Sequence, residues 1–324
     1  MTSIEICAGA GGQAIGLELA GFKHIALVEI EPLACETLKV NRPEWNVIKD
    51  DLKNFSAVKH KGIDLLAGGV PCPPFSIAGE QLGRLDDRNL FPEAIRLVQE
   101  CDPKAIMFEN VRGLLTNKFV TYRLEIEEQL SSLGYICEWK LFNASDFGVS
   151  QLRPRAILIA LKAEYFKYFT WPDKHEYPAK TVGELLYNEM ASLGWDKVDN
   201  WRRKANGIAP TLVGGSKKHG GADLGPTRAK LAWASLGVNG MGIANEAPIN
   251  GFASMPKLTL RMAALVQGFP SDWQFMGKKT SAYRQIGNAF PPPVAKAIGE
   301  SIKRALLSHE RETEKTQGSE SEAA

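Results

Sequence analysis

The strongest constraint on the fold is a regular alternation of short apolar runs and amphipathic segments between residues 3 and 161. Apolar runs of four to eight residues predict buried strands, and segments with helical periodicity predict helices between them. Such an alternation is typical of a parallel, doubly wound α/β sheet. The expected strands are residues 3–8, 24–30, 45–49, 63–68, 105–110 and 156–161, and the expected helices are 13–21, 31–41, 91–100 and 121–134.

The pattern changes after residues 1–170, which we expect to form one domain. Tryptophans, glycines and basic residues mix without a sustained period in residues 171–257, which predicts a smaller, irregular second domain. Residues 258–306 then return to helical periodicity, and we expect them to rejoin the first domain. The polar residues 307–324 predict a disordered tail.

Composition narrows the class of protein. A 324-residue chain with 44% hydrophobic and 23% charged residues is typical of a soluble protein with no membrane span. The cysteines are odd in number and form no C-x-x-C pair, so we expect no disulfide framework, no bound metal and a cytoplasmic location. The net charge of +2 is too small to indicate a nucleic-acid partner by itself. The cysteines are Cys7, Cys35, Cys72, Cys101 and Cys137.

A glycine-rich loop follows the first expected strand. Gly9, Gly11 and Ala14 fit the pattern G-x-G-x-x-[G/A], and Glu29 ends the next expected strand. A carboxylate at that place is typical of a ribose-binding residue. The loop could bind a dinucleotide pyrophosphate or the carboxylate of S-adenosylmethionine, and glycines can also merely permit a tight turn. A cofactor with a nucleoside is the interpretation that Glu29 favours.

Cys72 lies in the stretch GGVPCPPFS, directly after an expected strand. Pro73 forces Cys72 into an extended conformation, and Pro71 and Pro74 lack backbone donors, so neither a helix nor a central strand can pass through. The thiol is therefore expected on a stiff loop at the carboxyl end of a strand, where open α/β sheets bind ligands.

Eight motifs occur in the order and spacing of the bacterial DNA cytosine-5 methyltransferases, which the chain resembles over most of residues 3–306. The resemblance implies a Rossmann-like S-adenosylmethionine-dependent domain, with residues 171–257 as the family's variable target-recognition region. The motifs are EICAGAGGQAIGLELAGF, LVEIEPLA, DDL, GGVPCPPFS, FENV, FNASDFGVSQLRPRAILI, LTLRMAALVQGFP and YRQIGNAFPPPVAKAIG.

The resemblance also implies catalytic roles. Cys72 is implied to add to carbon 6 of cytosine, which activates carbon 5 for methylation. Glu109 is implied to donate a hydrogen bond or proton to N3. Arg153 and Arg155 alternate along an extended stretch and are expected on one side, near the cytosine carbonyl, where Arg155 would bind O2.

The resemblance also implies, position by position, which residues contact the cofactor. Cys7 departs from the phenylalanine usual in the family, so an aromatic contact with the cofactor is in doubt. The residues implied to bind S-adenosylmethionine are Cys7, Ala8, Gly9, Gly11, Gly12, Glu29, Ile30, Asp51, Leu52, Pro71, Leu90 and Asn288.

The implied partner is double-stranded DNA, because a stacked cytosine must be extruded to reach a buried site. A cognate restriction endonuclease would be genetically linked rather than bound, and we expect a monomer. The basic middle segment is expected to grip the DNA. Its predicted DNA-binding residues are Arg202, Arg203, Thr211, Lys217, Lys218 and Arg228.

Three alternatives remain at this stage. A transfer RNA methyltransferase has similar motifs, but its C-F-T element is absent because every cysteine precedes residue 138. A catalytically inactive DNA-binding homologue would be expected to lose Cys72, Glu109 or the arginines. An NAD-dependent dehydrogenase accounts for the glycine loop alone.

Overall fold

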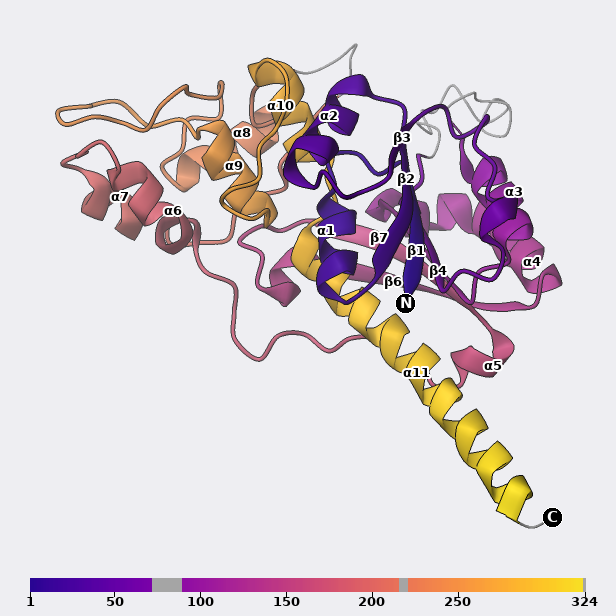
Figure 1. Cartoon of the computed structure of the whole chain (residues 1–324). Coiled ribbons are helices and arrows are strands. Elements are labelled where there is room, and N and C mark those ends of the chain that lie inside the picture. Colours follow the sequence, from indigo (N-terminus) through magenta and orange to yellow (C-terminus); the bar gives the residue numbers. More distant parts are fainter. Residues whose placement is uncertain (72–88, 216–220, 323–324) are drawn as a thin grey trace.

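A seven-stranded sheet forms the centre of the protein, whose computed structural model describes residues 1–71, 89–215 and 221–322. The strand order is β3-β2-β1-β4-β5-β7-β6, and β1 to β5 pair in parallel (Figure 1). The predicted doubly wound α/β class is therefore confirmed. The strands are β1 Thr2–Ile6, β2 Lys23–Glu29, β3 Val47–Lys49, β4 Leu65–Gly69, β5 Ala105–Val111, β6 Tyr135–Asn143 and β7 Pro154–Lys162.

The expectation of a wholly parallel sheet was wrong at one edge. β7 runs antiparallel to both β5 and β6, and the sequence analysis missed β6. β6 is the edge strand, and much of it is exposed, so it lacks the continuous apolar run that marked the other strands. Only a short segment with one 3-10 turn joins β6 to β7, and so short a connection allows only antiparallel pairing.

Helices cover both faces of the sheet. Helices α3 and α4 pack on one face with residues such as Ile4 and Leu66, whereas α1 and α11 pack on the other with Leu65 and Ile157. The helices are α1 Gly12–Leu19, α2 Pro32–Asn41, α3 Phe91–Cys101, α4 Val120–Ser132, α5 Ala163–Phe166, α6 Val182–Ala191, α7 Val198–Lys204, α8 Thr227–Ser235, α9 Leu260–Gln267, α10 Lys279–Asn288 and α11 Pro292–Glu322; the 3-10 turns are η1 Val58–His60, η2 Arg112–Leu115, η3 Asn117–Phe119 and η4 Ala144–Phe147.

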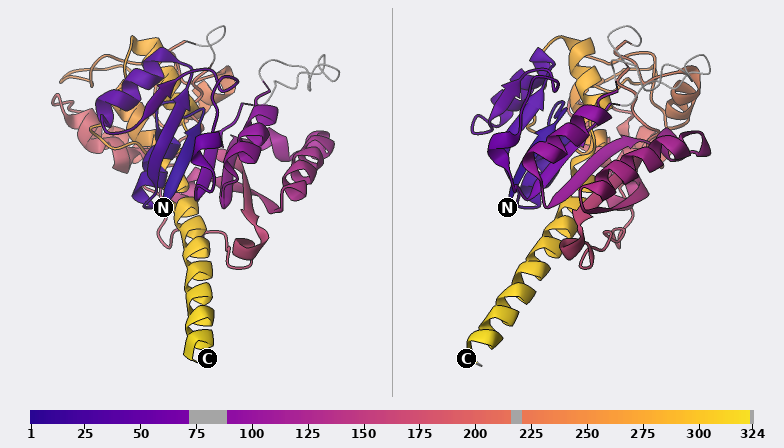
Figure 2. Two further views of the ribbon diagram at one scale, coloured as in Figure 1. Left: turned by 45° about the vertical axis from the view of Figure 1, so that its right-hand side comes forward. Right: turned by 90° about the vertical axis from the view of Figure 1, so that its right-hand side faces the viewer.

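Helix α11 corrects the prediction of a disordered tail from residue 307. It continues to Glu322 and extends away from the body of the protein (Figure 2). Two ion pairs hold its middle: Glu310 pairs with Lys104, and Glu312 pairs with Lys167. No proline interrupts the segment after the first turn, so helical hydrogen bonding can continue. Among the described residues, no helix is long and apolar enough to cross a membrane.

The segment 171–257 has few regular elements, as expected, but it does not have a separate core. Trp201 and Trp233 belong to the same buried cluster as Met262 of α9 and Tyr283 of α10. In Figure 1, α6 to α10 gather at the end of the sheet away from the C-terminus. The irregular segment therefore adjoins the edge where the parallel strands end.

Candidate active site

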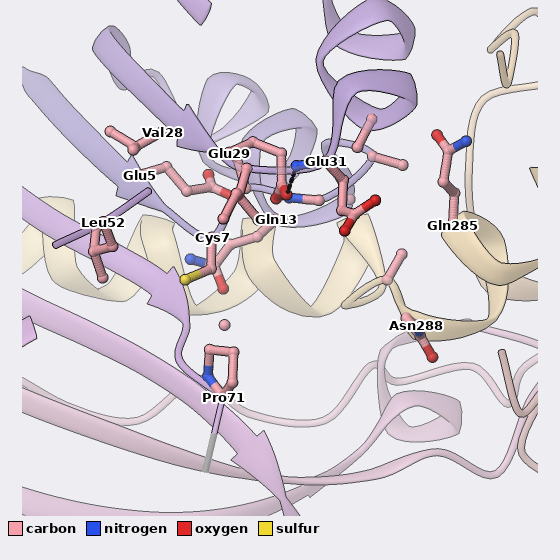
Figure 3. Close-up of a pocket in the computed structure, with 18 of the residues that line it drawn as sticks. Glu5, Cys7, Gln13, Val28, Glu29, Glu31, Leu52, Pro71, Gln285 and Asn288 are labelled. Carbon is pink, nitrogen blue, oxygen red and sulfur yellow. Dashed lines mark hydrogen bonds between the residues drawn. The ribbon is translucent and has the colours of Figure 1, made fainter. Parts of the chain in front are cut away.

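A cavity of about 880 Å³ lies at the carboxyl ends of the parallel strands (Figure 3). It runs from Asp51, after β3, through Glu29 of β2 and the loop after β1, to Glu109 of β5. This is the edge where doubly wound sheets bind ligands. Of the residues predicted to bind the cofactor, those that line the cavity are Cys7, Ala8, Gly9, Gly12, Glu29, Ile30, Asp51, Leu52, Pro71, Leu90 and Asn288.

Gly11 faces away from the cavity. It caps α1 with φ 88°, and a Cβ at this position would lie 2.7 Å from Leu38 Cδ2 and 3.1 Å from the Trp273 ring. A side chain at residue 11 would therefore clash with α2. The predicted glycine is explained by this close packing of the turn rather than by direct contact with a ligand.

Glu29 holds the glycine loop in place. Its Oε2 accepts a hydrogen bond from Gly9 N at 2.7 Å, and its Oε1 accepts one from Glu31 N at 2.8 Å. Burial raises the pKa of the Glu29 carboxyl, and these backbone donors act in the opposite direction. Each oxygen keeps a further lone pair. Glu29 can therefore order the loop and still accept hydrogen bonds from a ribose.

Glu109 and Arg155 form an ion pair at the other end of the cavity. Glu109 lies diagonally across from Arg155 on paired strands, and Arg155 Nε lies 2.6 Å from Glu109 Oε1. Both side chains are largely buried, with 14% and 13% of their surface exposed. A carboxylate and a guanidinium thus meet where the sheet ends, which suits recognition of a polar ring.

Buried hydrogen bonds hold the chain on either side of residues 72–88. Asn110 Nδ2 donates to Val70 O at 2.8 Å, and Leu90 N donates to Pro71 O at 3.3 Å. The asparagine after Glu109 therefore fixes the end of β4. The predicted nucleophile, Cys72, lies outside the described residues.

Two backbone carbonyls bind the buried side chain of Arg153. It precedes β7, is 1% exposed, and donates from Nη1 to Leu212 O and from Nη2 to Gly287 O, both at 2.9 Å. Burial lowers the pKa of its guanidinium, and the charge of nearby Arg155 adds to this effect. Arg153 thus joins the irregular segment to α10.

The thiols in the described residues are poorly suited to form thiolates. Burial raises the pKa of Cys35 to about 11, and that of Cys101 and Cys137 to about 12. Burial also raises the pKa of Cys7, and the negative charges of Glu29 and Asp51 raise it further. A thiol with a raised pKa is a weak nucleophile at neutral pH.

The predicted DNA-binding residues are dispersed. Arg202 and Arg203 are exposed on the last turn of α7, and Arg228 is exposed on α8. Thr211 is partly buried, and its hydroxyl donates to Leu152 O. Lys217 and Lys218 lie outside the described residues.

Two buried polar residues of the cavity were missed in the sequence analysis. Glu5 of β1 is 1% exposed, and Gln13 of α1 is 4% exposed. Burial raises the pKa of the Glu5 carboxyl well above its ordinary value. The sequence signal for Glu5 was a glutamate inside an apolar strand, whereas no sequence pattern indicated Gln13.

Within residues 1–71, 89–215 and 221–322, no group of three or more histidine, cysteine or acidic side chains is arranged to hold a metal ion. The polar side chains that line the cavity include the carboxyl groups of Glu5, Glu29 and Asp51 and the amides of Gln13, Gln285 and Asn288. Such groups suit an organic ligand that carries hydroxyl and amino groups.

Comparison with known proteins identifies the class of protein. The chain is 58% identical to the Type II methyltransferase M.NgoMIV of Neisseria gonorrhoeae, over 94% of this chain and 98% of that one. It is 55% identical to M.NaeI of Lentzea aerocolonigenes, over 94% and 75%. A prophage-encoded E. coli structure, described as a DNA modification methyltransferase, is similar in fold, with a TM-score of 0.69, 24% identity, and coverage of 95% and 99%.

The fold is that of the Rossmann-like methyltransferases. The chain belongs to the C-5 cytosine-specific DNA methylase family, whose sequence profile matches residues 1–304. The predicted family and enzyme class are thereby confirmed, and the dehydrogenase alternative is excluded.

The contacts of Arg153 predict a structural role. In Arg153→Met, the carbonyls of Leu212 and Gly287 lose their donor, and we expect the free energy of unfolding to fall by about 2–4 kcal/mol, because an unpaired buried polar group costs roughly 1–3 kcal/mol. Urea denaturation measures this change. Arg261→Met is the control, because Arg261 is 58% exposed and should change stability by less than about 0.5 kcal/mol. Equal stability of the two variants would contradict the role.

Proposed function

We propose that this protein transfers the methyl group of S-adenosylmethionine to carbon 5 of a cytosine extruded from double-stranded DNA. The observation that carries the proposal is the continuity of the cavity, which reaches from Glu29 and Asp51 to Glu109. A nucleoside held at the first end and a base held at the second would occupy the same cavity. Methyl donor and acceptor can then meet without passing through solvent.

The cofactor-binding residues fit S-adenosylmethionine, which supplies an electrophilic methyl group when it is bound. Glu29 would accept hydrogen bonds from the ribose hydroxyls. Asp51 and Leu52 follow β3 and line the cavity beside it, where they would contact the adenine. Asn288 closes the cavity from α10, and its Nδ2 donates to Gly215 O at 3.2 Å.

Cys72 is proposed as the nucleophile that activates the cytosine. Its thiolate would add to carbon 6, and N3 would take a proton from Glu109. Carbon 5 would then form a bond to the methyl group as the bond between that group and the sulfonium sulfur breaks, with S-adenosylhomocysteine as the leaving group. Loss of the carbon 5 proton to a base would expel the thiolate and restore the ring double bond, and N3 would return its proton to Glu109. The raised pKa values of the other four cysteines support this assignment, because burial disfavours their thiolates.

Glu109 and Arg155 are proposed to bind the polar edge of the ring. Their ion pair brings the carboxyl group of Glu109 and the guanidinium of Arg155 together on the paired strands β5 and β7. Glu109 would serve N3, and Arg155 would stabilise negative charge on O2. Arg153 would support the Glu109–Arg155 pair through its backbone hydrogen bonds and would not contact the base.

The irregular segment 171–257 is proposed to recognise the DNA sequence. Its exposed cations, Arg202, Arg203 and Arg228, can contact phosphates. The two curated relatives carry Type II methyltransferase names, which supports a role in a restriction-modification system with a genetically linked endonuclease. We further propose that the enzyme is a monomer that acts on DNA in the cytoplasm.

A covalent trap tests the nucleophile. DNA with 5-fluorocytosine at the target should form a stable adduct with the enzyme and S-adenosylmethionine, because fluorine cannot leave as a proton does. We expect no adduct from Cys72→Ala and a normal yield from the control Cys137→Ala. Denaturing gel electrophoresis and peptide mass spectrometry measure the adduct. An undiminished yield from Cys72→Ala would place the nucleophile elsewhere.

Replacement of Glu109 by glutamine tests proton donation. Glu109→Gln keeps the shape of the side chain but cannot release a proton to N3. Methyl transfer should fall by about 10²–10⁴-fold, as is typical of general acid–base groups, while cofactor affinity changes little. Single-turnover transfer of labelled methyl groups measures the rate. Unaltered turnover would remove Glu109 from the mechanism.

A chimera tests the recognition segment. Residues 171–257 would be exchanged for those of a relative that methylates a different site, with residues 212–215 retained because they pack directly on α10. We expect the relative's methylation site to be transferred, because base edges are read by groove contacts outside the catalytic cavity. Bisulfite sequencing maps the methylated sites. An active chimera with the original site would refute the assignment.

A further inference from the structure

Gln13 is a buried polar residue whose side chain has no hydrogen-bond partner in the part of the chain that the structure describes. It lies in the first turn of α1, lines the cavity, and is only 4% exposed. Neither its Oε1 nor its Nε2 has a hydrogen-bond partner among the described residues. A buried carboxamide without a partner is costly to the folded protein. Such a group is therefore a candidate for binding a ligand.

Gln285 provides an internal comparison, because it lines the same cavity. Its Oε1 accepts a hydrogen bond from Thr37 Oγ1 at 2.7 Å, and its Nε2 donates to Met276 O at 2.8 Å. The protein itself thus satisfies the amide of Gln285 at both ends. The amide of Gln13 has nothing comparable, and its side chain extends into the cavity (Figure 3).

The strand order shows which part of a ligand would reach Gln13. Asp51 and Glu29 follow or end the outer strands β3 and β2, whereas Glu109 ends β5. Gln13 follows β1, which lies between these two groups in the sheet. With the nucleoside at Glu29 and the methyl group directed toward Glu109, the amino-acid end of S-adenosylmethionine is the part nearest β1.

The chemistry of Gln13 matches that part of the ligand. The amino-acid end carries an ammonium group, which donates hydrogen bonds, and a carboxylate, which accepts them. A carboxamide offers one acceptor oxygen and two donor hydrogens, so it can serve both groups. Glu5, which also lines the cavity, has an Oε2 without a partner among the described residues. The carboxamide of Gln13 and one oxygen of Glu5 thus have no hydrogen-bond partner among the described residues.

We propose that Gln13 binds the amino-acid end of S-adenosylmethionine through its side-chain carboxamide. This rests on the proposed function, because it assumes that S-adenosylmethionine is the cofactor. Gln13 would offset the loss of an aromatic contact where Cys7 replaces the phenylalanine usual in the family. Hydrogen bonds to the ligand would then replace packing against it.

Binding of three ligands to Gln13→Met tests the proposal. Methionine has a similar length but makes no strong hydrogen bonds. By isothermal titration calorimetry, the Kd for S-adenosylmethionine and S-adenosylhomocysteine should rise about 10- to 100-fold, as expected for hydrogen bonds to charged groups. The Kd for 5′-methylthioadenosine, measured by competition, should change by less than about twofold, because this ligand lacks the amino-acid end.

Two further variants make the result decisive. Gln285→Met is the matched control and should not distinguish the three ligands, because its amide is bonded within the protein. Gln13→Leu likewise removes both the acceptor and the donors of the side chain while keeping it buried. It should also weaken only the two ligands that carry the amino-acid end.

The outcomes separate this inference from the proposed function. If the unaltered protein bound neither S-adenosylmethionine nor S-adenosylhomocysteine, the proposed cofactor would be wrong. If it bound both, but Gln13→Met bound them equally well, or lost affinity for all three ligands alike, the role of Gln13 alone would be refuted. A selective loss in both Gln13 variants, with none in Gln285→Met, would support it.

Discussion

The arrangement of the irregular segment on the sheet depends on the hydrogen bonds that the buried guanidinium of Arg153 donates. This guanidinium joins the carbonyl of Leu212, in the irregular segment, to that of Gly287, at the end of α10. The backbones approach so closely there that a Cβ on Gly287 would lie 2.5 Å from Gly214 N. A cation with only neutral acceptors is costly to bury, and removal of either carbonyl would leave it less satisfied. The position of the irregular segment is therefore tied to the position of the sheet.

This connection has a consequence for the cavity. Gly215 lines it together with Asn288, and the two are joined by a hydrogen bond. The segment proposed to recognise DNA thus contributes directly to the wall of the proposed cofactor site. A change in the path of residues 212–215 would alter that wall. The buried residues of the irregular segment accordingly pack in one cluster with those of α9 and α10 and with Leu27 of β2.

The electrostatics of the cavity follow from burial. Glu5 and Glu29 both have raised pKa values because desolvation disfavours their charged forms. Backbone donors to Glu29 offset part of that cost, and the Glu109 carboxylate forms an ion pair with Arg155. Glu5 and Gln13 keep side-chain atoms without partners in the described residues. The three glutamates thus differ in how many hydrogen-bond or ion-pair partners their carboxyl groups have among the described residues. This difference is a physical basis for different roles.

The sequence by itself determined the α/β class, the strands β1 to β5, the glycine turn and the family, because these depend on local patterns of apolar residues, glycines and short motifs. It could not determine the strand β6, whose exposed edge carries no clear apolar pattern, or the direction of β7, which pairing decides. It placed Arg153 beside Arg155 because the two alternate along the chain. Only the tertiary structure showed that Arg153 donates hydrogen bonds to the backbone carbonyls of Leu212 and Gly287, because these two residues are 59 and 134 positions away in the sequence. The same holds for Gln13, because only the folded cavity shows that its amide has no hydrogen-bond partner among the described residues.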